Sequence, residues 1–117
     1  MKTSLNAEVV FIQAKSFNEE VYSVLRKVPK GKVTTYKALA EKLGTKAYRA
    51  VGQAMKCNPY APEVPCHRVV ASDGSIGGFK GTWNPESNEV KRKIAMLKKE
   101  GVKIKNNRVV NFMEVLT

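Results

Sequence analysis

Two longer helices are predicted by apolar residues that recur at three- and four-residue spacing, one near each end of the chain. The first begins at the capping box Ser16-Phe17-Asn18-Glu19 and ends near residue 27, before the turn residues 29–32. The second is expected over residues 86–100, with Gly101 directly after it. Their inward stripes are Phe17, Val21, Val24, Leu25 and Val28 in the first helix, and Val90, Ile94, Met96 and Leu97 in the second.

Two short helices separated by a glycine lie between these longer ones. Thr35 is the expected N-cap of the first, which Gly44 ends, and Thr45 is expected to cap the next over residues 46–56. This spacing favours a helix-turn-helix whose second member is the recognition helix, although a helical hairpin without a DNA-binding role has the same pattern. The residues that define the pair are Ala38, Leu39, Ala40 and Leu43 on the inner face of the first helix, a slim face of Ala47, Ala50, Gly52 and Ala54 on the second, and the contact residues Tyr48, Arg49, Gln53 and Lys56.

Alternation with a period of two is confined to short segments. Residues 102–105 and 108–110 alternate around Asn106-Asn107, which predicts a hairpin and a candidate wing. A further turn is predicted at residues 72–75, and the glycine-rich residues 77–81 lack the pattern of a nucleotide-binding loop. The sequence therefore predicts a mainly α fold with small β segments, a winged helix-turn-helix-like DNA-binding domain over 16–117 after a short N-terminal arm over 1–15.

Composition narrows the class of partner. A chain of 117 residues, of which 43% are hydrophobic, can build one compact domain with its own core. The formal net charge is +11, and such an excess attracts polyanions, so nucleic acid is the leading partner. The alternatives are a surface charged only for solubility and the lysine bias of some thermophile proteins.

The expected location is intracellular. No apolar run approaches the ~20 residues of a membrane span, and the first residues lack the apolar segment of a signal peptide. Cys57 and Cys66 do not suggest a disulfide scaffold, which favours a reducing compartment. We expect a monomer without membrane contact that is cytoplasmic or nucleoid-associated, or nuclear in a eukaryote.

The pentapeptide Pro65-Cys66-His67-Arg68-Val69 carries the candidate chemistry, because the only histidine stands next to one of two cysteines. A nearby imidazole is the usual means of making a reactive thiolate. The pair stands at the expected entry to a strand, where adjacent side chains point to opposite faces, so a bridging water or a bend would have to connect them. A buried packing role fits the same pair. The spacing of Cys57, Cys66 and His67 does not match a zinc site, so no metal is expected.

Five stretches stand in the order and at the spacing of one protein family. They read Val-Pro-Lys-Gly-Lys-Val-Thr-Thr-Tyr at 28–36, Tyr-Arg-Ala-Val-Gly at 48–52, Asn-Pro at 58–59, Pro-Cys-His-Arg-Val-Val at 65–70 and Lys-Ile-Ala-Met-Leu-Lys-Lys-Glu-Gly at 93–101. Through them the chain, from about Phe17 to Ile104, resembles the C-terminal DNA-binding and active-site domain of O6-alkylguanine-DNA alkyltransferases. The resemblance implies an enzyme without a cofactor that acts once, moving an alkyl group from O6 of guanine in duplex DNA irreversibly onto its own cysteine.

The resemblance also implies roles for the catalytic residues. Cys66 would accept the alkyl group, and His67 would draw off the thiol proton through a water. Glu100 would orient His67 and stabilise its charge. Tyr36 would donate a proton to the departing guanine. This is the nucleophile, base and orienter arrangement of a triad.

Further roles implied by the resemblance concern DNA and the flipped base. The third helix would enter the minor groove, where Arg49 would fill the place that the extruded base leaves. Asn58 would brace the active-site turn, and the backbone of Val64, Cys66 and Val69 would hold the base by its edges. The DNA-binding residues implied are Tyr36, Arg49, Ala50, Gly52, Gln53 and Lys56.

Three departures from the family pattern concern the pocket wall. Phe79 replaces the usual tyrosine and cannot donate a hydrogen bond, and Lys80 stands where a small serine is common. The segment from Thr82 to Asn88 is a few residues longer than usual. Larger family members carry an N-terminal domain, and the arm over 1–15 is not expected to replace it.

Two rival functions remain beside the active transferase. An alkyltransferase-like protein binds alkylated DNA without catalysis and flags it for other repair machinery. Such proteins carry another residue, often tryptophan, at the cysteine position, and Cys66 argues against this reading. A winged-helix regulator is the other rival, although it needs no cysteine, histidine and glutamate constellation. The role of Cys57 beside Asn58 is open between a structural and a chemical one.

Overall fold

The computed structural model describes residues 17–117, so the 1–15 arm and the Ser16 cap lie outside the described residues. The first described helix covers residues 17–26. Its predicted stripe is confirmed, because Val21, Leu25 and Val28 are at most 2% exposed and Phe17 and Val24 pack against the core. Within residues 17–117, every helix is too short or too polar to span a bilayer.

The helix pair after this first helix forms as α2 (Tyr36–Leu43) and α3 (Tyr48–Lys56). The predicted ends of α2 are confirmed: Thr35 Oγ1 accepts a hydrogen bond from Ala38 N at 2.9 Å, and Gly44 has a φ of +70°. The predicted start of α3 is wrong by two residues. Thr45 Oγ1 accepts from Ala47 N at 3.1 Å and so forms a local turn, and Ala47 is the N-cap residue without a side-chain hydrogen bond.

A small parallel sheet, which the sequence did not predict, joins the start of α2 to the segment after the cysteine. β1 (Thr34–Thr35) pairs in parallel with β2 (Val69–Val70). The chain end closes against the residue before β1, since Val33 N donates to the carbonyl of Val115 at 2.9 Å. That closing segment includes α5 (Phe112–Val115), a short helix that was also not predicted.

The C-terminal half consists of α4 (Asn88–Lys99) and the hairpin of β3 (Ile104–Lys105) and β4 (Arg108–Val109). α4 begins later than predicted, because Ser87 Oγ caps it by accepting from Val90 N at 3.2 Å. The hairpin is confirmed as antiparallel, with Asn106 and Asn107 in its turn at φ values of 52° and 62°.

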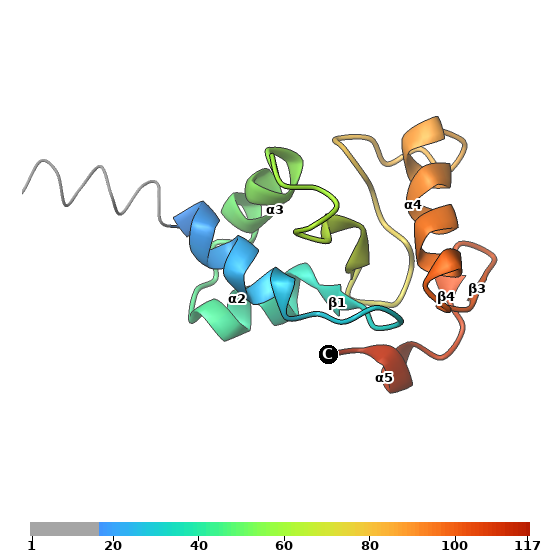
Figure 1. Ribbon diagram of the computed structural model, residues 1–117, viewed down its shortest axis with the longest axis horizontal. Helices are drawn as coiled ribbons and strands as arrows, with labels where there is room; N and C mark the ends of the chain where they lie inside the picture. Colours follow the sequence, from blue (N-terminus) through green and yellow to red (C-terminus); the bar gives the residue numbers. More distant parts are fainter. Residues whose placement is uncertain (1–16) are drawn as a thin grey trace, which may run out of the picture.

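Figure 1 shows how these parts are arranged: the first helix, α2 and α3 lie on one side, and α4 with the hairpin lies on the other. The turn η1 (Cys66–Arg68) runs between them and contacts α4. One hydrophobic core links both sides, and includes Leu25, Val51, Ile76 and Leu97. The fold is therefore mainly α with small β segments, as predicted, and it places the cysteine where the two sides meet.

Candidate active site

Cys66 opens a single turn of 3-10 helix, and the prediction that it begins a strand is wrong. Arg68 N donates to the carbonyl of Pro65 at 2.9 Å, so the chain turns through residues 66–68 and becomes extended only at Val69. Asn58 braces the preceding loop from both ends of its amide: Nδ2 donates to the Val64 carbonyl at 2.8 Å, and Oδ1 accepts from Tyr60 N at 2.9 Å. Of the two predicted ways to connect Cys66 and His67, a bridging water or a bend, the structure has a bend at this position.

His67 is held by Glu100, which stands at the C-terminal end of α4. Nε2 of His67 lies 3.0 Å from Oε2 of Glu100, and the imidazole is only 2% exposed. The same carboxylate accepts two hydrogen bonds from Arg68, at 2.9 Å from Nε and 2.7 Å from Nη2. Arg68 also donates to the Val28 carbonyl at 2.7 Å, which anchors the group to the end of the first helix. Paired guanidinium hydrogen bonds of this kind fix a carboxylate in both position and orientation.

The charges and burial of His67, Arg68 and Glu100 determine which nitrogen of the His67 imidazole carries the proton. Burial lowers the pKa of His67 and outweighs the hydrogen bond to Glu100, so the imidazole is neutral near pH 7. Burial alone would raise the pKa of Glu100, but hydrogen bonds from Arg68 and His67 outweigh it and hold that pKa below its usual range. Because an ionised carboxylate only accepts, Nε2 of His67 carries the proton and Nδ1 keeps a free lone pair. Nδ1 can therefore act as a base.

A cavity of about 560 Å³ opens above Cys66, between α3 and the glycine-rich segment. Cys66 is 6% exposed and lines this cavity together with Tyr36, the first residue of α2. Burial, followed by the proximity of Cys66, raises the pKa of Tyr36, so its phenol keeps the proton it could donate. Among residues 17–117, the side-chain hydrogen-bond partner of the His67 ring is Glu100, and a contact of His67 with Cys66 through a water stays a prediction.

The cavity gathers some predicted site residues and leaves others out. Predicted residues that line it are Cys66, Tyr36, Arg49, Gly52, Gln53, Lys56, Phe79 and Lys80. Those that do not are His67, Glu100, Ala50, Asn58, Val64 and Val69. His67 belongs to the turn that carries Cys66, Glu100 contacts its imidazole, and Asn58 contacts the loop before the turn at Val64.

The predicted use of the Val64 and Cys66 carbonyls and of the backbone near Val69 to hold a base stays a prediction, and two of the carbonyls in this segment already accept hydrogen bonds within the protein. The Val64 carbonyl already accepts from Asn58 Nδ2 and from Cys66 N. The Val69 carbonyl accepts from Nζ of Lys93 at 2.7 Å. A carbonyl oxygen offers two lone pairs, so both lone pairs of the Val64 carbonyl are engaged by Asn58 and Cys66, whereas Lys93 engages one of those of the Val69 carbonyl.

The slim face predicted for α3 is also only partly correct. Ala54 is fully buried, and its carbonyl accepts from the Tyr22 hydroxyl at 2.9 Å, so it belongs to the core. Gly52 lines the cavity, whereas Ala50 is half-buried outside it. Arg49 is exposed at the cavity edge, and no carboxylate of residues 17–117 forms an ion pair with it.

Several cavity and support residues were missed in the sequence. The missed lining residues are Met55 and Trp83, whereas Tyr48 was named as a contact of the third helix. The missed support residue is Lys93, which is 1% exposed. Its position between Val90 and Leu97 on the inward stripe was the available signal, because residues three or four apart share one helix face.

The ammonium of Lys93 ties the cysteine turn to the cavity wall. Nζ donates to three carbonyls, those of Val69 and Ile76 at 2.7 Å and that of Gly78 at 3.0 Å. Three donors thus meet three acceptors, which offsets part of the cost of burying the charge. Burial lowers the pKa of Lys93 to about 7, and the proximity of Cys66 acts in the opposite direction.

Lys93→Met is expected to flatten the pH dependence of stability between pH 7 and 9. An unfolded lysine keeps a pKa near ~10.4, so in this window the unfolded chain binds more protons than the folded one, and the free energy of unfolding rises with pH. One such group contributes at most ~1.4 kcal/mol per pH unit. Denaturant unfolding of parent and variant at pH 7, 8 and 9 measures the difference. Lys98→Met, at an exposed position of α4, should leave the slope unchanged. Parallel slopes for Lys93→Met and the parent would refute the assignment.

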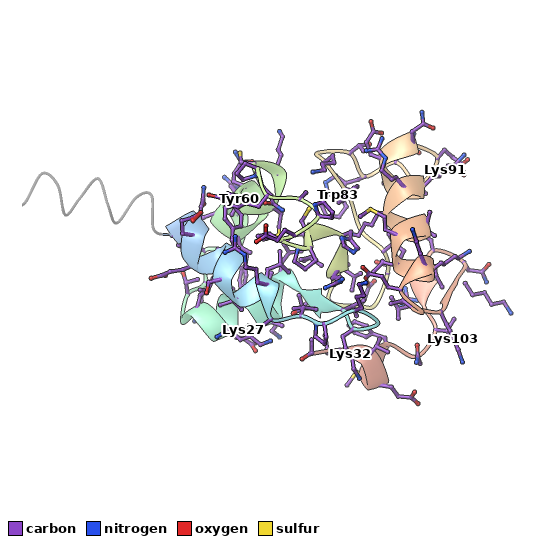
Figure 2. The ribbon with its side chains drawn as sticks, in the orientation of Figure 1. Lys27, Lys32, Tyr60, Trp83, Lys91 and Lys103 are labelled. Carbon is purple, nitrogen blue, oxygen red and sulfur yellow. The ribbon has the colours of Figure 1, made fainter. Side chains whose placement is uncertain are left out.

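Basic side chains extend well beyond the cavity. Figure 2 shows Lys27, Lys32, Lys91 and Lys103 around the edge of the molecule, from the first helix to the hairpin. Together with the net charge of +11, this distribution favours general attraction to a polyanion. Among residues 17–117, no cluster of three histidine, cysteine, aspartate or glutamate side chains is placed to hold a metal ion.

The sequence and the fold match known DNA-repair proteins. Residues 16–102 match the family described as 6-O-methylguanine DNA methyltransferase, DNA binding domain. A methylated-DNA–protein-cysteine methyltransferase of Saccharolobus islandicus is 44% identical over 97 residues, which are 83% of this chain and 58% of that protein. The chain thus spans less than two thirds of the length of this relative.

Two solved structures extend the comparison. The O6-methylguanine-DNA methyltransferase of Pyrococcus kodakaraensis is 46% identical with a TM-score of 0.62, over 74% of this chain and 46% of that one. Atl1 of S. pombe, in complex with damaged DNA containing O6-carboxymethylguanine, is 32% identical with a TM-score of 0.74, over 88% of this chain and 95% of that one.

Proposed function

Because the chain belongs to the O6-methylguanine DNA methyltransferase family, we propose that it repairs alkylated guanine in duplex DNA by irreversible transfer of the alkyl group to Cys66. One observation carries the proposal: Cys66 lies in the cavity beside the phenol of Tyr36, while its neighbour His67 is held by Glu100. This arrangement supplies a nucleophile and an acid in the cavity, with a base on the residue next to the nucleophile.

The proposed step balances within these residues. Nδ1 of His67 removes the thiol proton through a water, and the sulfur attacks the alkyl carbon as a thiolate. The bond between that carbon and O6 breaks, and its electron pair stays with guanine. Tyr36 protonates the leaving guanine and recovers a proton from the imidazolium through solvent. The carbon–sulfur bond is stable, so each molecule reacts once, and no cofactor is required.

Access to the lesion requires extrusion of the base. The O6 atom lies inside the base stack, and rotating the nucleotide out costs a few kcal/mol. We propose that α3 faces the lesion in the minor groove, with Tyr36, Ala50, Gly52, Gln53 and Lys56 near the DNA. Arg49 fills the vacated place, and phosphate contacts from lysines supply affinity that falls with salt. The protein acts as a monomer where DNA is found, in the cytoplasm or nucleoid, or in a nucleus.

A second candidate function is a sensor that binds alkylated guanine without transferring the group. The observation in its favour is the likeness to Atl1, most of whose length this chain covers. Both functions need α3 and a cavity for the base, so binding experiments alone do not separate them. A cysteine at the cavity floor is required only by the transferase.

Intact-protein mass after incubation with an O6-methylguanine duplex separates the two functions. The transferase gains one methyl group per molecule, on the peptide that contains Cys66, because the acceptor is consumed in the reaction. An undamaged duplex of the same sequence is the control and should add no mass. Binding of the damaged duplex with no change in mass would assign the sensor function instead.

A further inference from the structure

The only tryptophan of the chain stands on a tight turn at the rim of the cavity. Phe79 N donates to the Thr82 carbonyl at 2.8 Å, and Thr82 N donates back to the Phe79 carbonyl at 3.1 Å. Lys80 and Gly81 complete this turn with φ values of 53° and 85°, as a two-residue hairpin loop requires. The turn reverses the chain direction, so Trp83, the residue after Thr82, lies next to Gly78.

The backbone of two glycines supports the indole ring. A Cβ atom at Gly78 would lie 2.7 Å from Cδ2 of Trp83, and one at Gly77 would lie 3.5 Å from its Cζ3. Only glycine at 78 lets the ring approach this closely. One side of the indole is thus covered by backbone, and yet Trp83 remains 66% exposed and lines the cavity. Figure 2 places Trp83 between α3 and α4.

The cavity is large enough for a flat group in addition to the base, and aromatic side chains line it. Its volume of about 560 Å³ lies within the range of ~300–1,000 Å³ typical of small-molecule sites, more than a methylated base alone requires. Tyr36, Tyr48 and Phe79 line it together with Trp83. Phe79 carries no hydroxyl, so its ring is an apolar part of the wall, with the ammonium of Lys80 5.3 Å from the ring centroid. Aromatic rings attract a planar partner by stacking or edge contacts.

We propose that Trp83 is a specificity-determining residue whose free face stacks on large, flat substituents of O6 in guanine, so that the site favours arylmethyl groups over methyl. This inference rests on the proposed transfer function. The chemical step is the same: sulfur bonds to the benzylic carbon, the bond from that carbon to O6 breaks, and guanine leaves with a proton from Tyr36. The aryl group stays on Cys66.

Transfer rates with methyl and benzyl lesions in one duplex sequence test the role of Trp83. Trp83→Ala is expected to slow benzyl transfer by about 10-fold and methyl transfer by about 2-fold or less, which matches the loss of one stacking contact. Trp83→Phe should restore most of the benzyl rate. Met113→Ala, an exposed apolar side chain outside the cavity, is the control. An equal loss on both lesions, or no loss on benzyl, overturns the proposal.

A binding measurement keeps this proposal separate from the transfer function. Because Trp83 is the only tryptophan, its fluorescence reports the site directly. In the Cys66→Ala variant, free O6-benzylguanine is expected to quench this fluorescence more strongly than O6-methylguanine at equal occupancy. Absent or equal quenching overturns the stacking role. If the parent transfers neither group, the transfer function fails, and the titration still decides whether Trp83 meets the aryl ring.

Discussion

Cys66→Ala is expected to abolish alkyl transfer while leaving binding to damaged duplex DNA nearly unchanged. The sulfur of Cys66 is the proposed acceptor of the alkyl group, and it lines the cavity, whereas His67 and Glu100 do not. The side chain of Cys66 is 6% exposed, and its loss leaves the ion pair of Arg68 and Glu100 intact. The measurement is methyl incorporation by mass spectrometry, beside an electrophoretic binding assay on the same preparation.

Cys57→Ala is the matched control, since Cys57 is the only other cysteine and lies exposed at the end of α3. It should retain full transfer, because no group that could activate its thiol is hydrogen-bonded to it within residues 17–117. Methyl groups on Cys57, or repeated turnover by one protein molecule, would contradict the assignment of Cys66. Loss of binding in Cys66→Ala would mean that the cysteine also supports the fold.

The spacing of apolar residues predicted the helices because each helix buries one stripe of apolar side chains. The stripe of the first helix and the capping of α2 by Thr35 are as predicted, since both depend on residues within a few positions. β1 escaped prediction because two residues pair only with a distant partner strand. The start of α3 was misplaced because Thr45 makes a local turn in place of a cap.

The residues of the candidate site also fall into those that local sequence predicts and those that only the fold brings together. The cysteine motif is contiguous, so sequence alone named Cys66 and His67, and family resemblance added Glu100 and Tyr36. Lys93 was missed because a lysine in a basic helix suggests solvent, and only the fold brings three carbonyls to it. The covered face of Trp83 likewise depends on a turn and a glycine that come together only in the folded chain.

Arg49→Ala is expected to slow methyl transfer from a paired lesion by about 100-fold, because an arginine that fills the gap stabilises only the extruded state, and extrusion costs a few kcal/mol. Arg49 lies in the first turn of α3 at the cavity edge, exposed and without an ion pair among residues 17–117, so its removal should hardly affect stability. The affinity for undamaged duplex should fall only slightly, because the variant loses one positive charge. Single-turnover rates are compared on a paired O6-methylguanine, the same lesion in a weak mismatch, and free O6-benzylguanine.

The three substrates differ in the free energy needed to extrude the base, so comparing their rates tests whether Arg49 acts at the extrusion step. The loss should shrink in the mismatch and vanish for the free base, because the unstacking cost then disappears. Lys46→Ala removes an exposed cation just before α3 that does not line the cavity, and it should weaken duplex binding without this graded pattern. Equal impairment of Arg49→Ala on all three substrates would place Arg49 in the support of the pocket. A loss confined to duplex DNA would place it at the extrusion step, with α3 as the helix that faces the lesion.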